Sequence, residues 1–227
     1  MITLLQTGIA DSAAETGTGK TMSLFDFAAQ GGWIMIVLAL LSIIAVYIFV
    51  ERWIAIKNAA KVDINFMNNI KDNIHDSKIK AALNLCQRNN SPVARMIEKG
   101  VERIGRPLSD IQASVENVGS LEVARLEKGM PILASISGGA PMIGFLGTVI
   151  GMVQAFYEMS HAGNRIEISM LSGGIYTAMI TTIGGLIVGI FAYFAYNYLV
   201  TRINHVVYSM ESKTIEFMDL LNEPIND

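Results

Sequence analysis

The sequence is poor in charged residues and has almost no cysteine. Only 16% of its 227 residues are Asp, Glu, Lys or Arg, whereas a soluble domain has about 25%. The single cysteine, Cys86, excludes a disulfide within the chain. A formal net charge of -3 argues against nucleic acid as a partner. Hydrophobic residues make up 52% of the sequence, and this composition predicts a membrane protein.

Charge is missing altogether from three long stretches, residues 27–50, 129–157 and 168–201. Each exceeds the roughly 20 apolar residues that a helix needs to cross about 30 Å of hydrocarbon. Because open strands cannot span lipid, we expect an all-α membrane protein with three transmembrane helices. Trp33, Arg52 and Trp53 flank the first span, and we expect them at the membrane interfaces.

Lysine and arginine near these spans lie mainly on one side. Seven follow the first span, precede the second or follow the third, and two lie on the other side. Because cytoplasmic loops are enriched in these residues, we expect a periplasmic N-terminus and a cytoplasmic C-terminus. The predicted segments are a periplasmic arm with a short interfacial helix (1–30), the first span (31–50), a cytoplasmic helical loop (51–130), the second span (131–157), a short periplasmic loop (158–167), the third span (168–200) and a cytoplasmic C-terminal helix (201–227).

Local signals predict helices in the cytoplasmic loop. Ser91 is suited to cap a helix that has Pro92 at its first position, and Gly105 with Pro107 ends that helix. A further helix begins at Ser109 and runs toward the second span. The residues after the third span continue its helix. We therefore expect long helical extensions into the cytoplasm.

Small residues recur at helical spacing in the second and third spans. Because small residues let helices approach closely in lipid, they favour helix packing. The residues expected to pack helices together are Ala140, Pro141, Gly144, Gly147, Gly151, Gly173, Gly174, Gly184 and Gly185.

Threonine hydroxyls accompany these small residues, at Thr148, Thr177, Thr181 and Thr182. They have two interpretations: hydrogen bonds that hold helices together, or polar contacts that line a narrow ion path. The spans contain no Asp, Glu, Lys, Arg or His, and threonine does not titrate near neutral pH. A proton carrier would therefore have to come from another chain. The histidines have no metal-ligand spacing, and we expect no metal, no cofactor and no catalytic site.

Three motifs resemble the MotA/TolQ/ExbB family: VERW after the first span, APMIGFLGTVIGM in the second and GGIYTAMITTIGGLIVGIFAYFAYN in the third. The chain looks most like the ExbB branch. The resemblance implies a homopentamer around a central pore in a bacterial inner membrane. It also implies two copies of a single-span ExbD/TolR-like partner in that pore, whose aspartate carries the proton. The complex would use the proton motive force to energise a TonB-like protein for outer-membrane transport.

By this resemblance, Thr148 and Thr182 match threonines that line the channel. Thr177 stands where ExbB and TolQ proteins usually carry a glutamate, so the resemblance leaves both proton and sodium coupling open. The alternatives within the family are a TolQ-like motor for envelope integrity and another MotA-type stator. Outside it, the alternatives are a stand-alone channel and a scaffold whose hydroxyls only join helices.

Overall fold

The structure, a computed structural model, describes residues 31–61, 65–161 and 168–222, and in these residues all regular secondary structure is helical. The predicted arm of residues 1–30 and most of the predicted loop of residues 158–167 lie outside this part. The helices are α3 (Gly32–Ala59), α4 (Phe66–His75), α5 (Ile79–Arg88), α6 (Pro92–Val101), α7 (Leu108–Leu126), α8 (Met130–His161) and α9 (Ile168–Asn222).

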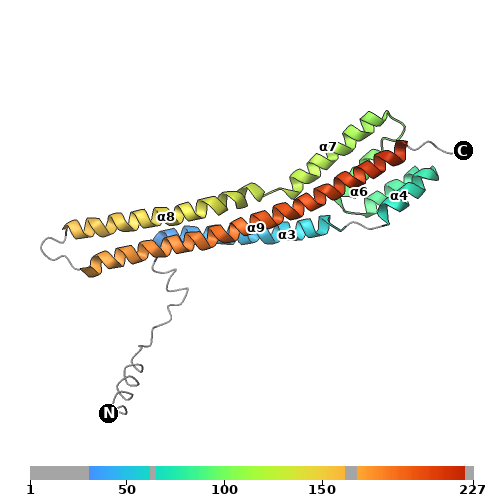
Figure 1. Cartoon of the computed structure of the whole chain (residues 1–227). Coiled ribbons are helices and arrows are strands. Elements are labelled where there is room, and N and C mark those ends of the chain that lie inside the picture. Colours follow the sequence, from blue (N-terminus) through green and yellow to red (C-terminus); the bar gives the residue numbers. More distant parts are fainter. Residues whose placement is uncertain (1–30, 62–64, 162–167, 223–227) are drawn as a thin grey trace, which may run out of the picture.

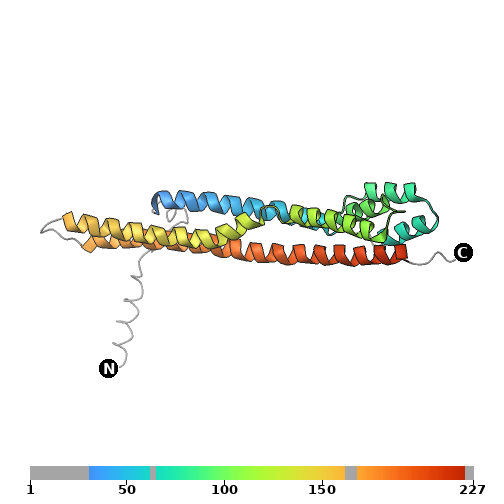
Figure 2. The same ribbon diagram turned by 90° about the horizontal axis from the view of Figure 1, so that it is seen from above.

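Helices α8 and α9 form a long antiparallel hairpin, and α3 packs beside it (Figures 1 and 2). Among the residues described, three helical segments are long and apolar enough to cross a membrane: Gly32–Ala59, Leu108–His161 and Leu171–Asn222. Because α9 has 55 residues, it is about 80 Å long at 1.5 Å per residue. This length far exceeds the roughly 30 Å of a hydrocarbon core. The apolar part of the hairpin therefore continues into a polar part.

That polar part is a small helical bundle, in which α4, α6 and α7 contact the C-terminal part of α9 and α5 packs against α4 and α6 (Figure 1). Its centre is formed by fully buried side chains such as Ile97, Val115 and Phe217. A break at Gly129, which has a φ of +82°, separates α7 from α8. Glycine adopts this left-handed conformation without strain, and it lets α7 diverge from the line of α8.

The signals that begin and end α6 agree with the structure in part. The Ser91 hydroxyl accepts a hydrogen bond from the backbone N–H of Ala94 at 3.2 Å, so the predicted N-cap is confirmed. The helix ends at Val101, earlier than predicted, and turns carry the chain to Gly105, which has a φ of +96°. The amphipathic helix α4, in which Phe66, Met67 and Ile70 are buried at helical spacing, was not singled out from the sequence.

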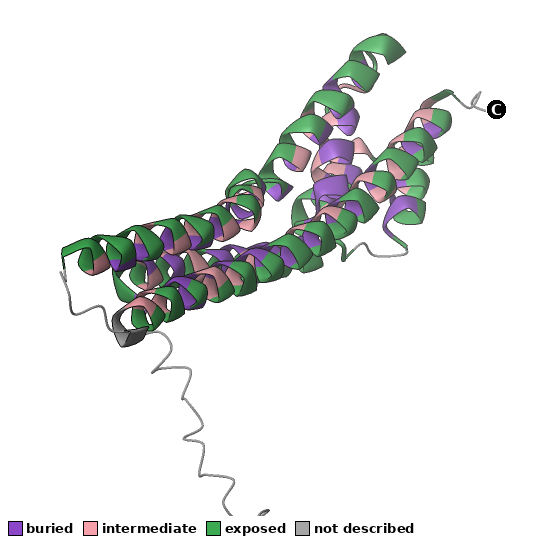
Figure 3. Cartoon of the chain, turned by 60° about the vertical axis from the view of Figure 1, so that its left-hand side comes forward, coloured by how far each residue is buried: buried purple, intermediate pink, exposed green. Residues whose placement is uncertain are grey.

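Burial divides each membrane helix into a narrow inner strip and a wide exposed surface (Figure 3). Large apolar side chains lie on the outside of the hairpin, with Met142, Phe145 and Phe194 exposed by 73%, 67% and 68%. A soluble monomer rarely exposes an apolar surface of this extent. The exposed surface therefore suits contact with lipid or with other membrane chains.

Candidate functional site

The candidate site is the contact between α8 and α9, which is built from residues without bulk. A Cβ atom added to Gly144 would lie 2.8 Å from the backbone oxygen of Thr181 and 3.1 Å from Cα of Gly185. A Cβ atom added to Gly185 would lie 2.6 Å from the backbone oxygen of Ala140. Since the obstructing atoms belong to backbone, they cannot rotate away. The two helices are therefore as close as their backbones allow, and this closeness requires glycine.

The same contact continues along the hairpin toward its turn. Gly151 lies against Ala178, with an added Cβ 3.0 Å from the Ala178 methyl group, and Gly174 lies against Ala155. These pairs extend the contact by two further helical turns.

Toward the other end of the hairpin, Pro141 packs against Gly189. Proline in a helix cannot donate to the carbonyl four residues earlier, which here belongs to Ser137. That oxygen lies 3.1 Å from a Cβ built on Gly189. We did not single out Gly189 or Ala155 from the sequence, although each lies four residues after a glycine that we did select.

Not every selected glycine lies in this contact. Gly184 faces α3, where an added Cβ would lie 3.1 Å from the Met35 sulfur and 3.5 Å from Leu38. Gly173 is exposed, and an added Cβ there would meet nothing within 4 Å. Gly184 thus makes room for α3, and Gly173 packs against none of the helices that the structure describes.

Three of the four selected threonines gather around Gly144. The hydroxyls of Thr181 and Thr182 both lie 3.3 Å from the Gly144 carbonyl oxygen, and Thr148 follows Gly144 by one turn of α8. Thr181 is 2% exposed and also donates to the Ala178 carbonyl at 2.7 Å. Its side chain fills the space that the missing Cβ of Gly147 leaves. Thr181 therefore lies inside the helix contact.

Thr148, Thr177 and Thr182 are only partly buried. Thr148 donates to the Phe145 carbonyl of its own helix, and Thr177 precedes Thr181 by one turn on the same side of α9. A partly exposed hydroxyl keeps acceptor capacity for an ion, a water molecule or a second chain. These three hydroxyls are among the polar groups that the described part of the hairpin leaves partly accessible.

The structure shows what holds Arg52, whose place at the membrane interface stays a prediction. Its side chain is buried, and Nη1 donates to the Arg125 carbonyl in the last turn of α7 at 2.8 Å. It also pairs with Glu51. The last carbonyls of a helix have no partner within the helix, so Arg52 caps α7 from α3. Trp33 and Trp53 are exposed, by 64% and 40%, and their place at the membrane interface stays a prediction.

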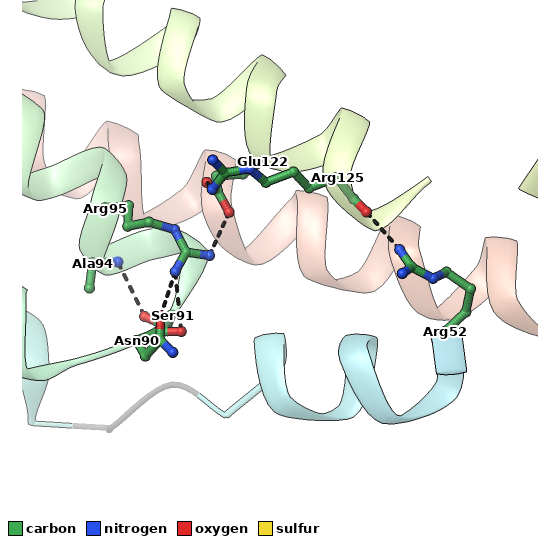
Figure 4. A network of polar contacts seen from close by, with 7 residues as sticks. All are labelled: Arg52, Asn90, Ser91, Ala94, Arg95, Glu122 and Arg125. Carbon is green, nitrogen blue, oxygen red and sulfur yellow. Dashed lines mark hydrogen bonds and ion pairs between the residues drawn. The ribbon is translucent and has the colours of Figure 1, made fainter. Parts of the chain in front are cut away.

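Next to the hydrogen bond between Arg52 and Arg125 lies a buried carboxylate that binds two arginine side chains (Figure 4). It was not identified from the sequence. Glu122 is 4% exposed and accepts from Arg95 Nη2 at 2.5 Å and from Arg125 Nη1 at 2.6 Å. Arg95 also donates to the Asn90 side chain at 2.8 Å. The network joins α6 to α7, and Arg52 links it to α3. Its only sequence signal was the spacing of three residues between Glu122 and Arg125.

In the described residues, no group of three His, Cys, Asp or Glu side chains could hold a metal ion. The chemistry that the hairpin offers is therefore that of hydroxyl and carbonyl oxygens at a close contact between two apolar helices.

Comparison with known proteins identifies the hairpin and its polar extension. Residues 88–212 match the MotA/TolQ/ExbB proton channel family, a region that includes α6, α7, α8 and most of α9. The chain belongs to this family. The family description names a channel, and the match includes both the Gly144 contact and the Glu122 network.

Several curated proteins are similar to this member of the family. A putative biopolymer transport protein ExbB homolog from Methanothermobacter thermautotrophicus is 26% identical over 194 residues, which cover 85% of this chain and 67% of that protein. The biopolymer transport protein ExbB of Neisseria meningitidis is 25% identical over 180 residues, 73% of this chain and 80% of that protein. The Tol-Pal system protein TolQ of Haemophilus influenzae is 36% identical over 101 residues, 44% of each chain.

Proposed function

We propose that this protein is the ExbB-like subunit of an ion-driven motor in a bacterial inner membrane. Five copies surround a central pore that holds two copies of an ExbD/TolR-like single-span partner. The motor uses the proton motive force to energise a TonB-like protein, and so outer-membrane transport. The similarity to proteins named ExbB supports this assignment.

The observation that carries the proposal is the combination of hydroxyls and absent acids in the hairpin. Thr182 lies at the Gly144 contact, Thr148 follows Gly144 by one turn of α8, and the stretches 129–157 and 168–201 contain no titratable carboxylate, lysine, arginine or histidine. A hydroxyl can orient water or an ion but does not titrate near neutral pH, so it cannot hold or release a net proton. The proton carrier must then be a carboxylate on another chain, which a membrane site tolerates where polar partners solvate it.

The orientation of the chain is part of this proposal. The excess of Lys and Arg after the first span, before the second and after the third favours a cytoplasmic location for residues 51–130 and 201–227. The small bundle of α4 to α7 with the end of α9 is then a cytoplasmic extension. The segment between the second and third spans is then periplasmic.

Thr177 bears on the transported ion. It lies one turn from Thr181 and is partly buried, so a longer acidic side chain at this position would reach beyond the α8–α9 contact. In this protein the position contributes only a hydroxyl. We propose proton coupling that depends wholly on the partner's carboxylate, with sodium coupling as the alternative.

The proposal is tested by reconstituting this chain into liposomes with and without an ExbD/TolR-like single-span protein. Proton flux is followed with an entrapped pH dye, and native mass spectrometry counts the copies of each chain. We expect five copies of this chain with two of the partner, and flux only when both are present. Loss of flux on changing the partner's membrane aspartate to asparagine is also expected. Flux from this chain alone would identify a self-contained channel instead.

A TolQ-like role in envelope integrity is the second candidate. It is supported by the 36% identity to TolQ over 101 residues, which equals the 36% identity to the ExbB of Neisseria gonorrhoeae over 94 residues. Deleting this chain separates the two roles. Loss of energised nutrient uptake with an intact envelope indicates the first, and leakage of periplasmic proteins indicates the second.

A further inference from the structure

A cavity of about 270 Å³ lies between α3 and α9, at the level where their apolar stretches end. Trp53, Ile56 and Lys57 of α3 form one wall, and Arg202 and His205 of α9 form the other. Arg202 is the first charged residue after the stretch of residues 168–201, and Lys57 follows the end of the first stretch by seven residues. The cavity therefore opens at the boundary between hydrocarbon and water.

The charged side chains in the lining, Lys57 and Arg202, are both cationic, and His205 adds an imidazole. Aromatic rings hold the two cations: Lys57 Nζ lies 5.3 Å from the centre of the Trp53 ring, and the Arg202 guanidinium lies 6.0 Å from that of Tyr198. In the described part of the chain neither cation is in an ion pair. A cation held by an aromatic face keeps its N–H donors for an anion.

The surface next to the cavity is apolar and faces away from the chain. Val50 and Val46 precede Trp53 by three and seven residues, which places them on the same side of α3, and they are 44% and 45% exposed. On α9, Tyr198 contacts Phe49 of α3 with ring centres 6.3 Å apart. This surface would accommodate acyl chains, which a free phosphate ion lacks.

We propose that this cavity binds the phosphate headgroup of an anionic phospholipid, with its acyl chains along the exposed surface of α3 and α9. Lys57 and Arg202 contact the phosphate oxygens, His205 donates a hydrogen bond, and Trp53 lies at the glycerol level. Basic pockets between membrane helices recognise anionic headgroups in this way. On the orientation proposed above, the lipid belongs to the cytoplasmic leaflet. Headgroup binding does not depend on the motor function, so its test is separate.

The test uses the full-length protein in a neutral detergent, titrated with phosphatidylglycerol or phosphatidylcholine. Native mass spectrometry counts the retained lipids, and Trp53 fluorescence is read in a Trp33→Phe background. We expect phosphatidylglycerol to bind more tightly than phosphatidylcholine. Lys57→Gln with Arg202→Gln should lower phosphatidylglycerol affinity about 25-fold, at roughly fivefold per cation. Phosphatidylcholine binding should not change.

Two control variants separate recognition from folding and from net charge. Lys57→Arg with Arg202→Lys keeps both charges and should retain phosphatidylglycerol binding. Lys80→Gln with Arg106→Gln removes two exposed charges outside the cavity and should leave binding unchanged. The proposal is overturned if the Lys57→Gln, Arg202→Gln protein binds phosphatidylglycerol as well as the parent. It is also overturned if soluble glycerol phosphate displaces phosphatidylglycerol completely and the protein does not bind the lipid more tightly than glycerol phosphate. The cavity would then be a site for a soluble phosphate compound.

Discussion

The contact between α8 and α9 and the polar part differ in the residues they bury, although large side chains such as Leu133 and Ile180 are buried in the apolar part as well. In the apolar part, Gly144, Gly185 and Ala178 are inside, and Phe145 and Phe194 are outside. In the polar part, large side chains such as Phe217 are inside, and charged residues cover the outside. One helix, α9, takes part in both arrangements. The surroundings of each part, and not the helix itself, therefore decide which side chains of α9 pack against the neighbouring helices.

The physical reason lies in what each solvent offers. Lipid tails are as apolar as leucine, so burying a large side chain between membrane helices gains little, and close packing of small residues holds them together. Water makes the burial of Phe217 or Ile97 favourable at about 25 cal/mol per Å². The polar part also carries the Glu122 network, in which two guanidinium groups satisfy one buried carboxylate.

The largest expected effect is a loss of proton flux, without loss of assembly, when one hydroxyl is removed from the hairpin. Thr182→Val keeps the shape of the side chain and removes the hydroxyl beside the Gly144 carbonyl. We expect proton flux with the partner to fall roughly tenfold or more, which is the value of one hydrogen bond, while the complex still assembles. Thr201→Val is the matched control, because that exposed hydroxyl bonds only to Asn197 of its own helix, at 2.9 Å. Unchanged flux in Thr182→Val would assign the hydroxyl to packing alone.

The next effect tests close approach in the apolar part. Gly144→Ala places a Cβ 2.8 Å from a backbone oxygen of α9, and overpacking of this kind costs about 1–3 kcal/mol. We expect the free energy of unfolding in detergent to fall by that amount. Gly138→Ala in the same helix is the control, because its Cβ would meet nothing within 4 Å. Equal stability of the two variants would show that the helices can separate without cost.

A smaller effect tests the charged network in the polar part. Glu122→Gln leaves Arg95 and Arg125 facing a neutral amide. Since Arg95 and Arg125 are 34% and 70% exposed, water compensates in part, and we expect a loss of about 1–2 kcal/mol. Hydrogen exchange of the α6 and α7 amides measures it. Glu116→Gln, in an exposed position that accepts from Gln112 at 2.8 Å, should leave the exchange unchanged. Faster exchange throughout α8 as well would mean that the two parts unfold together.

The smallest expected effect is the labelling of Cys86, which measures how often α5 opens locally in the folded polar part. Burial is the main cause that raises the pKa of the Cys86 thiol to about 12. A pKa raised above its usual range keeps the thiol protonated at pH 8, so almost no reactive thiolate is present. We expect a maleimide to label the folded protein slowly and the denatured protein quickly. An exposed cysteine introduced by Ser120→Cys should react at once. Rapid labelling of Cys86 in the folded protein would show that α5 opens independently of the membrane helices.

Predictions from the sequence agreed best with the structure where a feature depends only on the local residues and their chemistry. The Ser91 cap and the three apolar segments follow from local hydrogen bonding and hydropathy, and both agree with the structure. The family assignment, made from three short motifs, agrees with the match over residues 88–212. The glycines indicated close packing, but only the structure distinguished Gly144, which faces α9, from Gly184, which faces α3, and from exposed Gly173.

By itself the sequence determined that the chain is helical, that three segments suit a membrane, and that those segments carry hydroxyls without acids. These properties depend on hydropathy and residue chemistry, which are local. The tertiary structure decided that Arg52 caps α7, that Glu122 is buried between two arginines, and that Lys57 and Arg202 line one cavity. Each of these three features brings together residues that are far apart in the sequence, or buries a charged side chain. Periodicity cannot foresee such contacts, because they depend on which helices become neighbours.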